Sequence, residues 1–230
     1  MRNSGSSMWT GRKPGGLKVK HHVLFIGNSH TYVENLPWLF TAVCKQAGRD
    51  AHATMLTYPG CDWSWHLSSG CALPNIRYGG YDYVVIQQRS HPFDGTEAFY
   101  EQGLDLFKAI SDANATAVFM NTWSEKNNPD GQKKIDDAFA ALHALCPGSR
   151  IAKCGPTWHS LRGTVDLYAD DGEHQNARGA YLNACVLAQT IFNIDPLGLP
   201  STIETDAISM KLTQEETTFL QKTAAAICRG

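Results

Sequence analysis

The chain has 230 residues, of which 43% are hydrophobic and 18% charged, and its formal net charge at pH 7 is -2. This composition is typical of a globular protein and excludes the disordered and fibrous classes. The 20 basic and 22 acidic side chains nearly balance, and neither sign forms a long run. Nucleic acid is therefore not expected as a partner.

The chain carries no recognisable targeting or membrane segment. No window approaches the roughly 20 apolar residues of a membrane helix, and residues 1–20 lack the apolar centre of a signal peptide. We expect no membrane partner and a cytoplasmic location for the chain as given, with secretion left open if a leader was removed. Residues 1–20 predict a flexible tail, and residues 21–230 predict a single α/β domain.

The seven cysteines are an odd number, are widely scattered and include no C-x-x-C pair. This spacing disfavours a disulfide framework or a zinc site, so we expect no metal. One pairing stays open, because Cys61 and Cys71 stand at the two ends of one loop.

Apolar runs alternate with helical patterns along the chain. Val23–Ile26 predicts a buried strand that ends in Gly27-Asn28-Ser29, and a Gly/Ser/Trp loop follows the second strand. Asn176 offers an N-cap for a late helix with an apolar stripe. Further strands are expected near 51–56, 81–86, 115–120 and 150–154, and helices near 36–47, 96–111, 131–145, 176–191 and 213–228. The pattern predicts a doubly wound, parallel five-stranded sheet flanked by helices.

In such a sheet the ligand crevice lies beyond the carboxyl ends of the strands. Most of the unusual residues of this chain fall in the segments that should occupy this edge. These segments are 27–31, 57–66, 87–93, 121–125 and 155–174.

Ser29 follows the first buried strand directly, on a turn between Gly27 and His30. A hydroxyl held there, close to backbone N–H groups, suits a nucleophile. Two other roles stay open for it, namely hydrogen bonding within its own loop and holding an anion at the turn.

A serine nucleophile needs a histidine base and a carboxylate that orients the imidazole. Among nine histidines, His174 stands out because Asp171 precedes it by three residues, in a D-x-x-H loop. Asp171 is preferred for that spacing, although a loop shifted by one residue would place Asp170 in the same role. A solvated loop histidine is the alternative interpretation.

The G-N-S after the first strand and the D-x-x-H before the last long helix together resemble the SGNH hydrolases, also called GDSL-type esterases. The resemblance spans residues 22–193 in order and spacing, and it lies closest to the carbohydrate-esterase-like branch. It implies the flavodoxin-like fold of that family, Ser29 as nucleophile, His174 as general base and Asp171 as its orienting partner. It implies no cofactor.

The same resemblance implies an oxyanion hole. Besides the N–H of Ser29, Gly60 in Tyr58-Pro59-Gly60-Cys61 is similar in position to the glycine of the family. The third block departs from the usual G-x-N-D, because this chain has Gln87-Gln88 there. A glutamine amide can donate the same N–H, and since successive strand residues point to opposite faces, only one of the two should face the hole. Gln87 is preferred.

Large aromatic side chains gather in the segments that should ring the crevice. Aromatic faces stack on sugar rings and also line acyl pockets. Asp62, Arg89, His91 and Glu125 would add polar groups to this mouth. The expected substrate-binding residues are Trp63, Trp65, His66, Phe93, Trp123 and Trp158.

The sequence therefore predicts a serine esterase that removes short acyl groups, acetyl above all, from a small-molecule or carbohydrate ester. Two alternatives stay open. One is a lysophospholipase-, thioesterase- or peptidase-like hydrolase with the same three residues, because triad chemistry does not select the acyl donor. The other is a non-catalytic sandwich that binds a sugar or a phosphate. The oligomeric state is not predicted.

Overall fold

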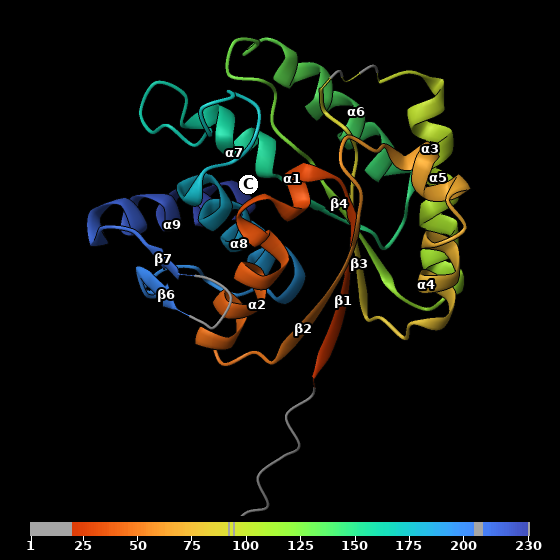
Figure 1. Cartoon of the computed structure of the whole chain (residues 1–230), viewed down its shortest axis with the longest axis horizontal. Coiled ribbons are helices and arrows are strands. Elements are labelled where there is room, and N and C mark those ends of the chain that lie inside the picture. The colour runs from red at the N-terminus through yellow and green to blue at the C-terminus, as the bar shows by residue number, and fades with distance from the viewer. Residues whose placement is uncertain (1–19, 92, 94, 205–208, 230) are drawn as a thin grey trace, which may run out of the picture.

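The computed structural model of this protein describes residues 20–91, 93, 95–204 and 209–229. Its centre is a parallel sheet of five strands in the order β2-β1-β3-β4-β5 (Figure 1). The strands are β1 (His21–Gly27), β2 (Ala51–Thr57), β3 (Tyr83–Gln87), β4 (Thr116–Met120) and β5 (Arg150–Ala152). The chain thus moves outward from β1 in both directions, which is the doubly wound arrangement that the sequence predicts.

Helices connect the strands, and a small hairpin follows the last long connection. The helices are α1 (Ser29–Tyr32), α2 (Leu36–Gln46), α3 (Trp63–Ser68), α4 (Ala72–Tyr78), α5 (Glu97–Asp112), α6 (Gly131–Leu145), α7 (Cys154–Ser160), α8 (Ala177–Phe192) and α9 (Gln214–Arg229). A 3₁₀ turn, η1 (Val33–Asn35), joins α1 to α2, and β6 (Thr202–Glu204) pairs antiparallel with β7 (Ser209–Lys211). Among the described residues, no helix combines the length and the hydropathy of a membrane span.

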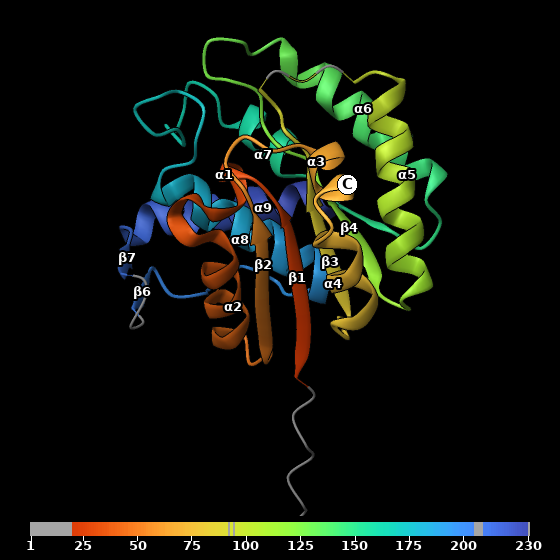
Figure 2. The same cartoon turned by 45° about the vertical axis from the view of Figure 1, so that its right-hand side comes forward.

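Side chains of β1 alternate between two hydrophobic cores, as expected for a strand buried on both faces. Val23 and Phe25 pack into the core that α2, α8 and α9 cover. Leu24 and Ile26 pack into the core that α3, α4, α5 and α6 cover. Figures 1 and 2 show these two helical layers on opposite sides of the sheet.

Local sequence signals explain where the helices next to the site begin. The side chain of Asn176 caps α8 by accepting from the backbone N–H groups of Arg178 and Gly179. Pro37 lies in the first turn of α2, where its missing N–H costs no hydrogen bond. Asn35 precedes α2 in a left-handed conformation, but its side chain makes no capping hydrogen bond.

The predicted five-stranded parallel α/β fold is confirmed, and the predicted long helices are present. The structure adds elements that the sequence analysis did not anticipate. Helices α3 and α4 replace most of the expected Gly/Ser/Trp loop, α7 follows β5 at once, and β6 and β7 form a separate hairpin. The predicted tail, residues 1–20, lies outside the described residues except for its last residue.

Candidate active site

Ser29 is the first residue of α1 and follows β1 after a single intervening residue, Asn28. The Asn28 side chain accepts a hydrogen bond from the backbone N–H of His30 at 3.0 Å, and its carbonyl accepts from Thr31 N at 2.9 Å. This local capping turns the chain sharply at the end of the strand. Ser29 is half-buried there, at the carboxyl edge of the sheet.

Gln87, at the end of the neighbouring strand β3, braces this turn. Its Oε1 accepts from Asn28 N at 2.8 Å and from Thr31 Oγ1 at 3.0 Å, and its Nε2 donates to the carbonyl of Gln88. Gly27 leaves room for the brace, because a Cβ there would lie 2.4 Å from both Gln87 Oε1 and Thr31 Oγ1. These bonds assign the amide oxygen of Gln87 and one of its N–H groups to bracing the turn. Its remaining N–H as an oxyanion donor stays a prediction.

Gln88 joins the loop after β3 to α3. Its Oε1 accepts from Trp63 N at 3.0 Å and from Arg89 N at 2.8 Å. The side chain is buried, and its amide oxygen is held by these two bonds. A role for its amide N–H groups in the oxyanion hole stays a prediction.

The turn that contains Gly60 lies directly beside the Ser29 turn. Asn28 Nδ2 donates to the carbonyl of Cys61 at 2.9 Å, and Tyr58 N donates to the carbonyl of Gly27 at 3.3 Å. Gly60 is exposed and adopts φ +64°, a left-handed conformation that favours glycine. Its N–H as an oxyanion donor also stays a prediction.

His66 packs against the backbone that precedes the Ser29 turn and does not face a substrate. It is completely buried, and its Nε2 lies 3.0 Å from the carbonyl oxygen of Gly27 and 3.1 Å from Cys61 Sγ. Burial lowers the pKa of this imidazole. The predicted substrate contact of His66 is therefore wrong. Cys61 is a buried free thiol and Cys71 an exposed one, so the two are not paired.

Asp171 holds both the ring and the backbone of His174. Its Oδ2 lies 2.7 Å from His174 Nδ1, and its Oδ1 accepts from the backbone N–H groups of Glu173 and His174, each at 2.9 Å. Burial alone would raise the pKa of Asp171, but these backbone bonds and the imidazole together lower it to about 2. Asp170 is exposed, and the carboxylate that contacts His174 is that of Asp171.

The D-x-x-H loop packs against the Ser29 turn although 145 residues separate the two segments. Gln175 Nε2 donates to the carbonyls of Val33, at 2.6 Å, and of His30, at 3.4 Å. The His30 and His174 rings stack with centroids 5.2 Å apart. The Nε2 atom of His174 is buried and has no hydrogen-bond partner, so it is not bonded to the hydroxyl of Ser29 in this structure.

Two further imidazoles, which the resemblance did not include, flank His174. The ring of His30 lies 5.0 Å from that of His91, between His91 and His174. Burial, together with its two histidine neighbours, lowers the pKa of His30 to about 3. Burial likewise lowers the pKa of His91 to about 4. Both rings are therefore neutral at pH 7.

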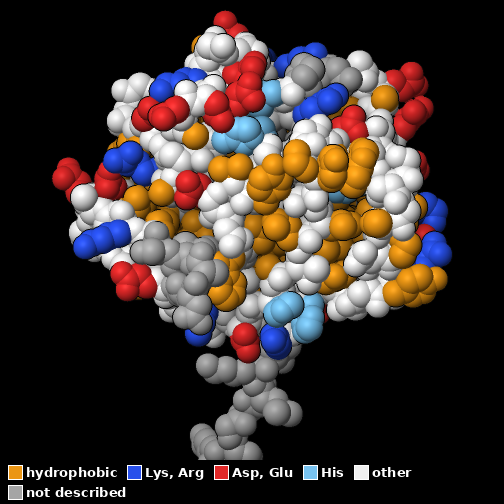
Figure 3. Space-filling model, viewed as in Figure 1, with side chains coloured by type: hydrophobic (Ala, Val, Ile, Leu, Met, Phe, Trp, Pro, Cys, Tyr) orange, Lys and Arg blue, Asp and Glu red, His pale blue; other side chains and the backbone are white. Residues whose placement is uncertain are grey.

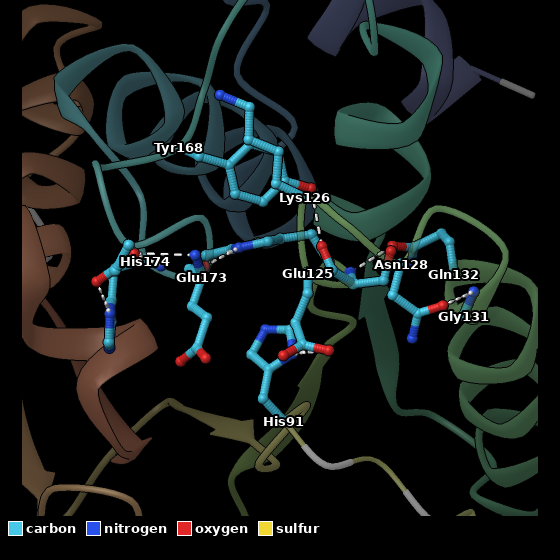
Figure 4. A network of polar contacts seen from close by, with 12 residues as sticks. His91, Glu125, Lys126, Asn128, Gly131, Gln132, Tyr168, Glu173 and His174 are labelled. Carbon is cyan, nitrogen blue, oxygen red and sulfur yellow. Dashed lines mark hydrogen bonds and ion pairs between the residues drawn. The ribbon is translucent and has the colours of Figure 1, made fainter.

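Carboxylates complete this edge of the sheet. Figure 4 shows His91 beside the carboxylate of Glu125, with the side chain of Glu173 directed into the space between His174 and His91. The His91 Nδ1 to Glu125 Oε2 distance is 3.9 Å. The loop after β4 is fastened to the D-x-x-H loop, because Trp123 Nε1 donates to the carbonyl of Glu173 and Lys126 N to that of Gly172, both at 2.8 Å.

Three of the predicted substrate-binding tryptophans are buried. The predictions for Trp63 and Trp123 are wrong, because both side chains are enclosed in the core. Trp158 lines a cavity beside Arg162 and Tyr168, so its contact with a substrate stays a prediction. Trp63 is fully buried among aromatic rings, with Phe99 stacked on it at 5.1 Å. Trp123 and Trp158 stack on each other at 4.0 Å beneath the loops of the site, and both are buried. Their flat faces stabilise the loops that carry His174 and Glu125.

The remaining two predicted aromatic contacts are not buried in the core. Trp65 is exposed and stacks on Tyr58 at 4.9 Å, while Phe93 is half-buried. Figure 3 shows hydrophobic side chains gathered over the middle of the face that includes the edge strand β2. Contact of Trp65 or Phe93 with a substrate stays a prediction.

No family model matches the sequence, and no curated protein matches it either. The structure, in contrast, is similar to several solved structures. TesA superposes with a TM-score of 0.63 at 13% identity, covering 76% of this chain and 99% of TesA. The psychrotrophic esterase EstA from Pseudoalteromonas sp., in a form inhibited by monoethylphosphonate, gives a TM-score of 0.60 at 17% identity and covers 75% and 97% of the two chains.

A carbohydrate esterase of family 3 from Talaromyces cellulolyticus is also similar, with a TM-score of 0.56 at 14% identity over 73% of this chain and 94% of that one. A member of the lipolytic G-D-S-L family from Veillonella parvula superposes with a TM-score of 0.58 at 13% identity, covering 75% of this chain and 98% of that one. At such identities the likeness establishes the fold. The chain has the fold of the GDSL-type, or SGNH, hydrolases.

Proposed function

We propose that this protein is a serine carboxylic-ester hydrolase in which Ser29 is the nucleophile, His174 the general base and Asp171 the orienting carboxylate. The observation that carries the proposal is the position of the Asp171–His174 pair. Gln175, the residue after His174, is hydrogen-bonded to the backbone of His30, which follows Ser29 in α1, and to that of Val33, which follows α1 directly. The imidazole is fixed through Nδ1 and keeps an unbonded Nε2.

In the first half-reaction the oxygen of Ser29 forms a bond to the carbonyl carbon of the ester. The proton of the hydroxyl passes to Nε2 of His174, and the carbonyl oxygen takes the electron pair of the broken π bond. The N–H groups of Ser29 and Gly60, with the amide of Gln88, are our candidates for stabilising this oxyanion. When the intermediate collapses, the bond to the alcohol breaks and His174 returns its proton to the alcohol oxygen.

In the second half-reaction water hydrolyses the acyl-enzyme. His174 removes a proton from the water, whose oxygen bonds to the acyl carbon, and then gives the proton back to Ser29 as the carboxylic acid leaves. Asp171 keeps Nδ1 protonated in both halves, because it accepts from that nitrogen at 2.7 Å. The base of this chemistry is neutral imidazole, so acid should suppress it.

We further propose that the acyl group is short, with acetyl preferred, and that the alcohol is a carbohydrate. Large side chains crowd the edge of the sheet around Ser29, where the ring of His30 lies 5.0 Å from that of His91 and 5.2 Å from that of His174. The likeness to a carbohydrate esterase of family 3 agrees with this substrate class. Lipases share the same fold, so the substrate must be decided by kinetics.

Kinetics with p-nitrophenyl esters of increasing chain length test the proposal. Replacement of Ser29 by Ala should lower kcat by about a thousandfold or more, because only the oxyanion donors and substrate binding remain. Wild-type kcat/KM should be highest for the acetyl ester and fall as the chain lengthens. An alanine variant that keeps its esterase activity would refute the nucleophile, and a preference for octanoyl or longer esters would refute the short acyl pocket.

A further inference from the structure

A cavity of about 280 Å³ with a mixed polar and apolar lining opens between the loops that follow β3 and β4 and the start of α6, and Phe93 and Ile135 supply part of its apolar lining. Its lining includes hydroxyl, amide, imidazole, carboxylate and ammonium groups. The polar residues that line it are Ser90, His91, Ser124, Glu125, Asn128 and Lys134. The proposed function leaves this cavity without a role.

His91 is the wall that the cavity and the reaction centre share. On one side its Nδ1 lies 3.9 Å from Glu125 Oε2. On the other side its ring lies 5.0 Å from that of His30, which stacks on His174. Figure 4 shows the same succession, with Glu173 and His174 on one side of His91 and Glu125 and the residues near α6 on the other. A group bound in the cavity is therefore next to an ester bond held at Ser29.

Two polar atoms of this wall have no protein partner. Ser90 is 4% exposed and its Oγ makes no hydrogen bond, and the His91 side chain is 8% exposed with an unbonded Nε2. A hydroxyl and a neutral imidazole can each donate or accept a hydrogen bond. Buried polar atoms are normally paired, so this pair of orphan groups points to a ligand with hydroxyl groups.

Glu125 and Lys134 are the charged residues that line the cavity, and the part of it next to His91 disfavours anions. Glu125 and Glu173 flank His91, which is neutral and therefore does not compensate them. Lys126 is paired with Asp166 at 2.8 Å. Lys134, at the cavity, directs its ammonium group to the carbonyl of Phe93 at 3.4 Å. A phosphate or carboxylate bound next to His91 would therefore meet the carboxylate of Glu125 in a partly desolvated space, with Glu173 on the other side of the same ring.

We propose that this cavity binds the alcohol portion of the ester, that this portion is uncharged and rich in hydroxyl groups, and that Glu125 is the hydrogen-bond acceptor that selects it. The inference rests on the proposed esterase function and deepens it. It favours an acylated sugar over an acyl-phospholipid or an acyl-coenzyme A, both of which carry phosphate. A carboxylate binds sugar hydroxyls through short, charge-assisted hydrogen bonds.

The test compares three acetyl esters: p-nitrophenyl acetate, a methyl glucoside with one acetyl group, and the matched methyl glucuronoside. For the wild type we expect kcat/KM to be about tenfold or more higher on the glucoside than on the glucuronoside at low salt, and the gap to narrow as salt is added. Glu125→Gln should lower the ratio of kcat/KM on the glucoside to that on p-nitrophenyl acetate by about tenfold, through KM, because a charge-assisted hydrogen bond is lost. The same substitution should also reduce the difference in kcat/KM between the glucoside and the glucuronoside.

Glu215→Gln is the matched control, because Glu215 is an exposed carboxylate in the first turn of α9. It should leave both ratios unchanged. Equal kcat/KM on the two sugar esters, or a Glu125→Gln variant with wild-type ratios, would overturn the inference. In that case the proposed function still holds if the protein hydrolyses p-nitrophenyl acetate and loses this activity in Ser29→Ala. If the wild type cleaves none of the three esters, the proposed function itself fails and the inference falls with it.

Discussion

The Asp171–His174 pair is the most specific chemical feature of the molecule at the scale of single residues. One carboxylate binds the ring nitrogen through Oδ2 and two backbone N–H groups through Oδ1. These three bonds fix the direction of the ring and its tautomer at once, since Nδ1 must carry the proton that Asp171 accepts. Nε2 is then left as the lone-pair nitrogen that a base requires.

Replacement of Asp171 by Asn should remove this control with little change in shape. An asparagine side chain is uncharged and has one acceptor oxygen, so it cannot accept from the two backbone N–H groups and from His174 Nδ1 as the carboxylate does. The tautomer with a lone pair at Nε2 therefore loses its stabilisation. We expect kcat on p-nitrophenyl acetate to fall by about a thousandfold to ten-thousandfold, measured from initial rates at pH 7.5 on a variant with a native circular-dichroism spectrum.

Asp170→Asn is the matched control, because Asp170 is the exposed neighbour of the same loop and is not the carboxylate that contacts His174. Its kcat should stay within about twofold of the wild type, as for surface substitutions in general. A large loss in Asp170→Asn together with a small loss in Asp171→Asn would mean that the carboxylate has been assigned to the wrong residue.

Individual residues also show what a sequence can reveal about such a site. The candidates Ser29, His174 and Asp171 could be selected from the sequence because each follows a local rule, namely a strand end or a fixed spacing. Trp123 was misassigned, because the sequence around a tryptophan that follows a strand is the same whether the side chain faces solvent or packs under a loop. Only its stacking on Trp158 at 4.0 Å and its complete burial decide the question.

At the scale of elements, three connections meet at the histidine cluster: His30 from the turn after β1, His91 from the loop after β3, and His174 from the D-x-x-H loop. The folded state holds the first two imidazoles in their neutral form, with pKa values of about 3 and 4 against an ordinary value of 6.5. The cluster should therefore couple the stability of the fold to pH.

The sign of this coupling follows from which state binds more protons. Between pH 6.5 and about 4, the unfolded chain protonates both histidines while the folded chain keeps them neutral, so the free energy of unfolding falls as the pH falls. Each histidine contributes a slope of up to about 1.4 kcal/mol per pH unit. Their contribution is fully present above pH 6.5 and is lost progressively in acid, which urea unfolding at pH 7, 6 and 5 measures.

His91→Gln should make the free energy of unfolding less steep in pH, since one of the two titrating groups is gone. His52→Gln is the control, because His52 is exposed on β2. The free energy of unfolding of this variant should depend on pH as steeply as that of the wild type. If the free energy of unfolding of His91→Gln falls with pH as steeply as that of the wild type, or if the wild type becomes more stable from pH 7 to pH 5, the claim that these buried imidazoles are neutral in the folded state is contradicted.

The elements also show which sequence signals were sufficient. Long amphipathic helices such as α5 and α6 and the apolar strands β1, β3 and β4 were predicted to within about two residues, because their patterns extend over many positions. The short helices α3 and α4 were taken for a loop, since Ser68, Ser69 and Gly70 break any periodic pattern between them. The one local signal was Asp62, whose side chain caps α3 by accepting from Trp65 N.

At the scale of the whole molecule, the doubly wound sheet accounts for how distant segments share one edge. Residues 29, 60, 88, 125 and 174 all follow strands or lie in loops at the carboxyl edge, where α/β folds carry their ligands. Structures with only 13–17% identity to this chain share its fold, so many different sequences can form this sheet. The topology therefore predicted where the site lies, whereas the cavity at Glu125 depends on side-chain packing that topology does not determine.

The most direct test of the central claim is covalent labelling by a fluorophosphonate, followed by peptide mapping. An activated serine should attack phosphorus and displace fluoride, so we predict one adduct per chain, located on Ser29, absent from Ser29→Ala and formed at least about a hundredfold more slowly in His174→Gln. An adduct on another serine, or no adduct with the wild type under conditions that label a known serine esterase, would contradict the account.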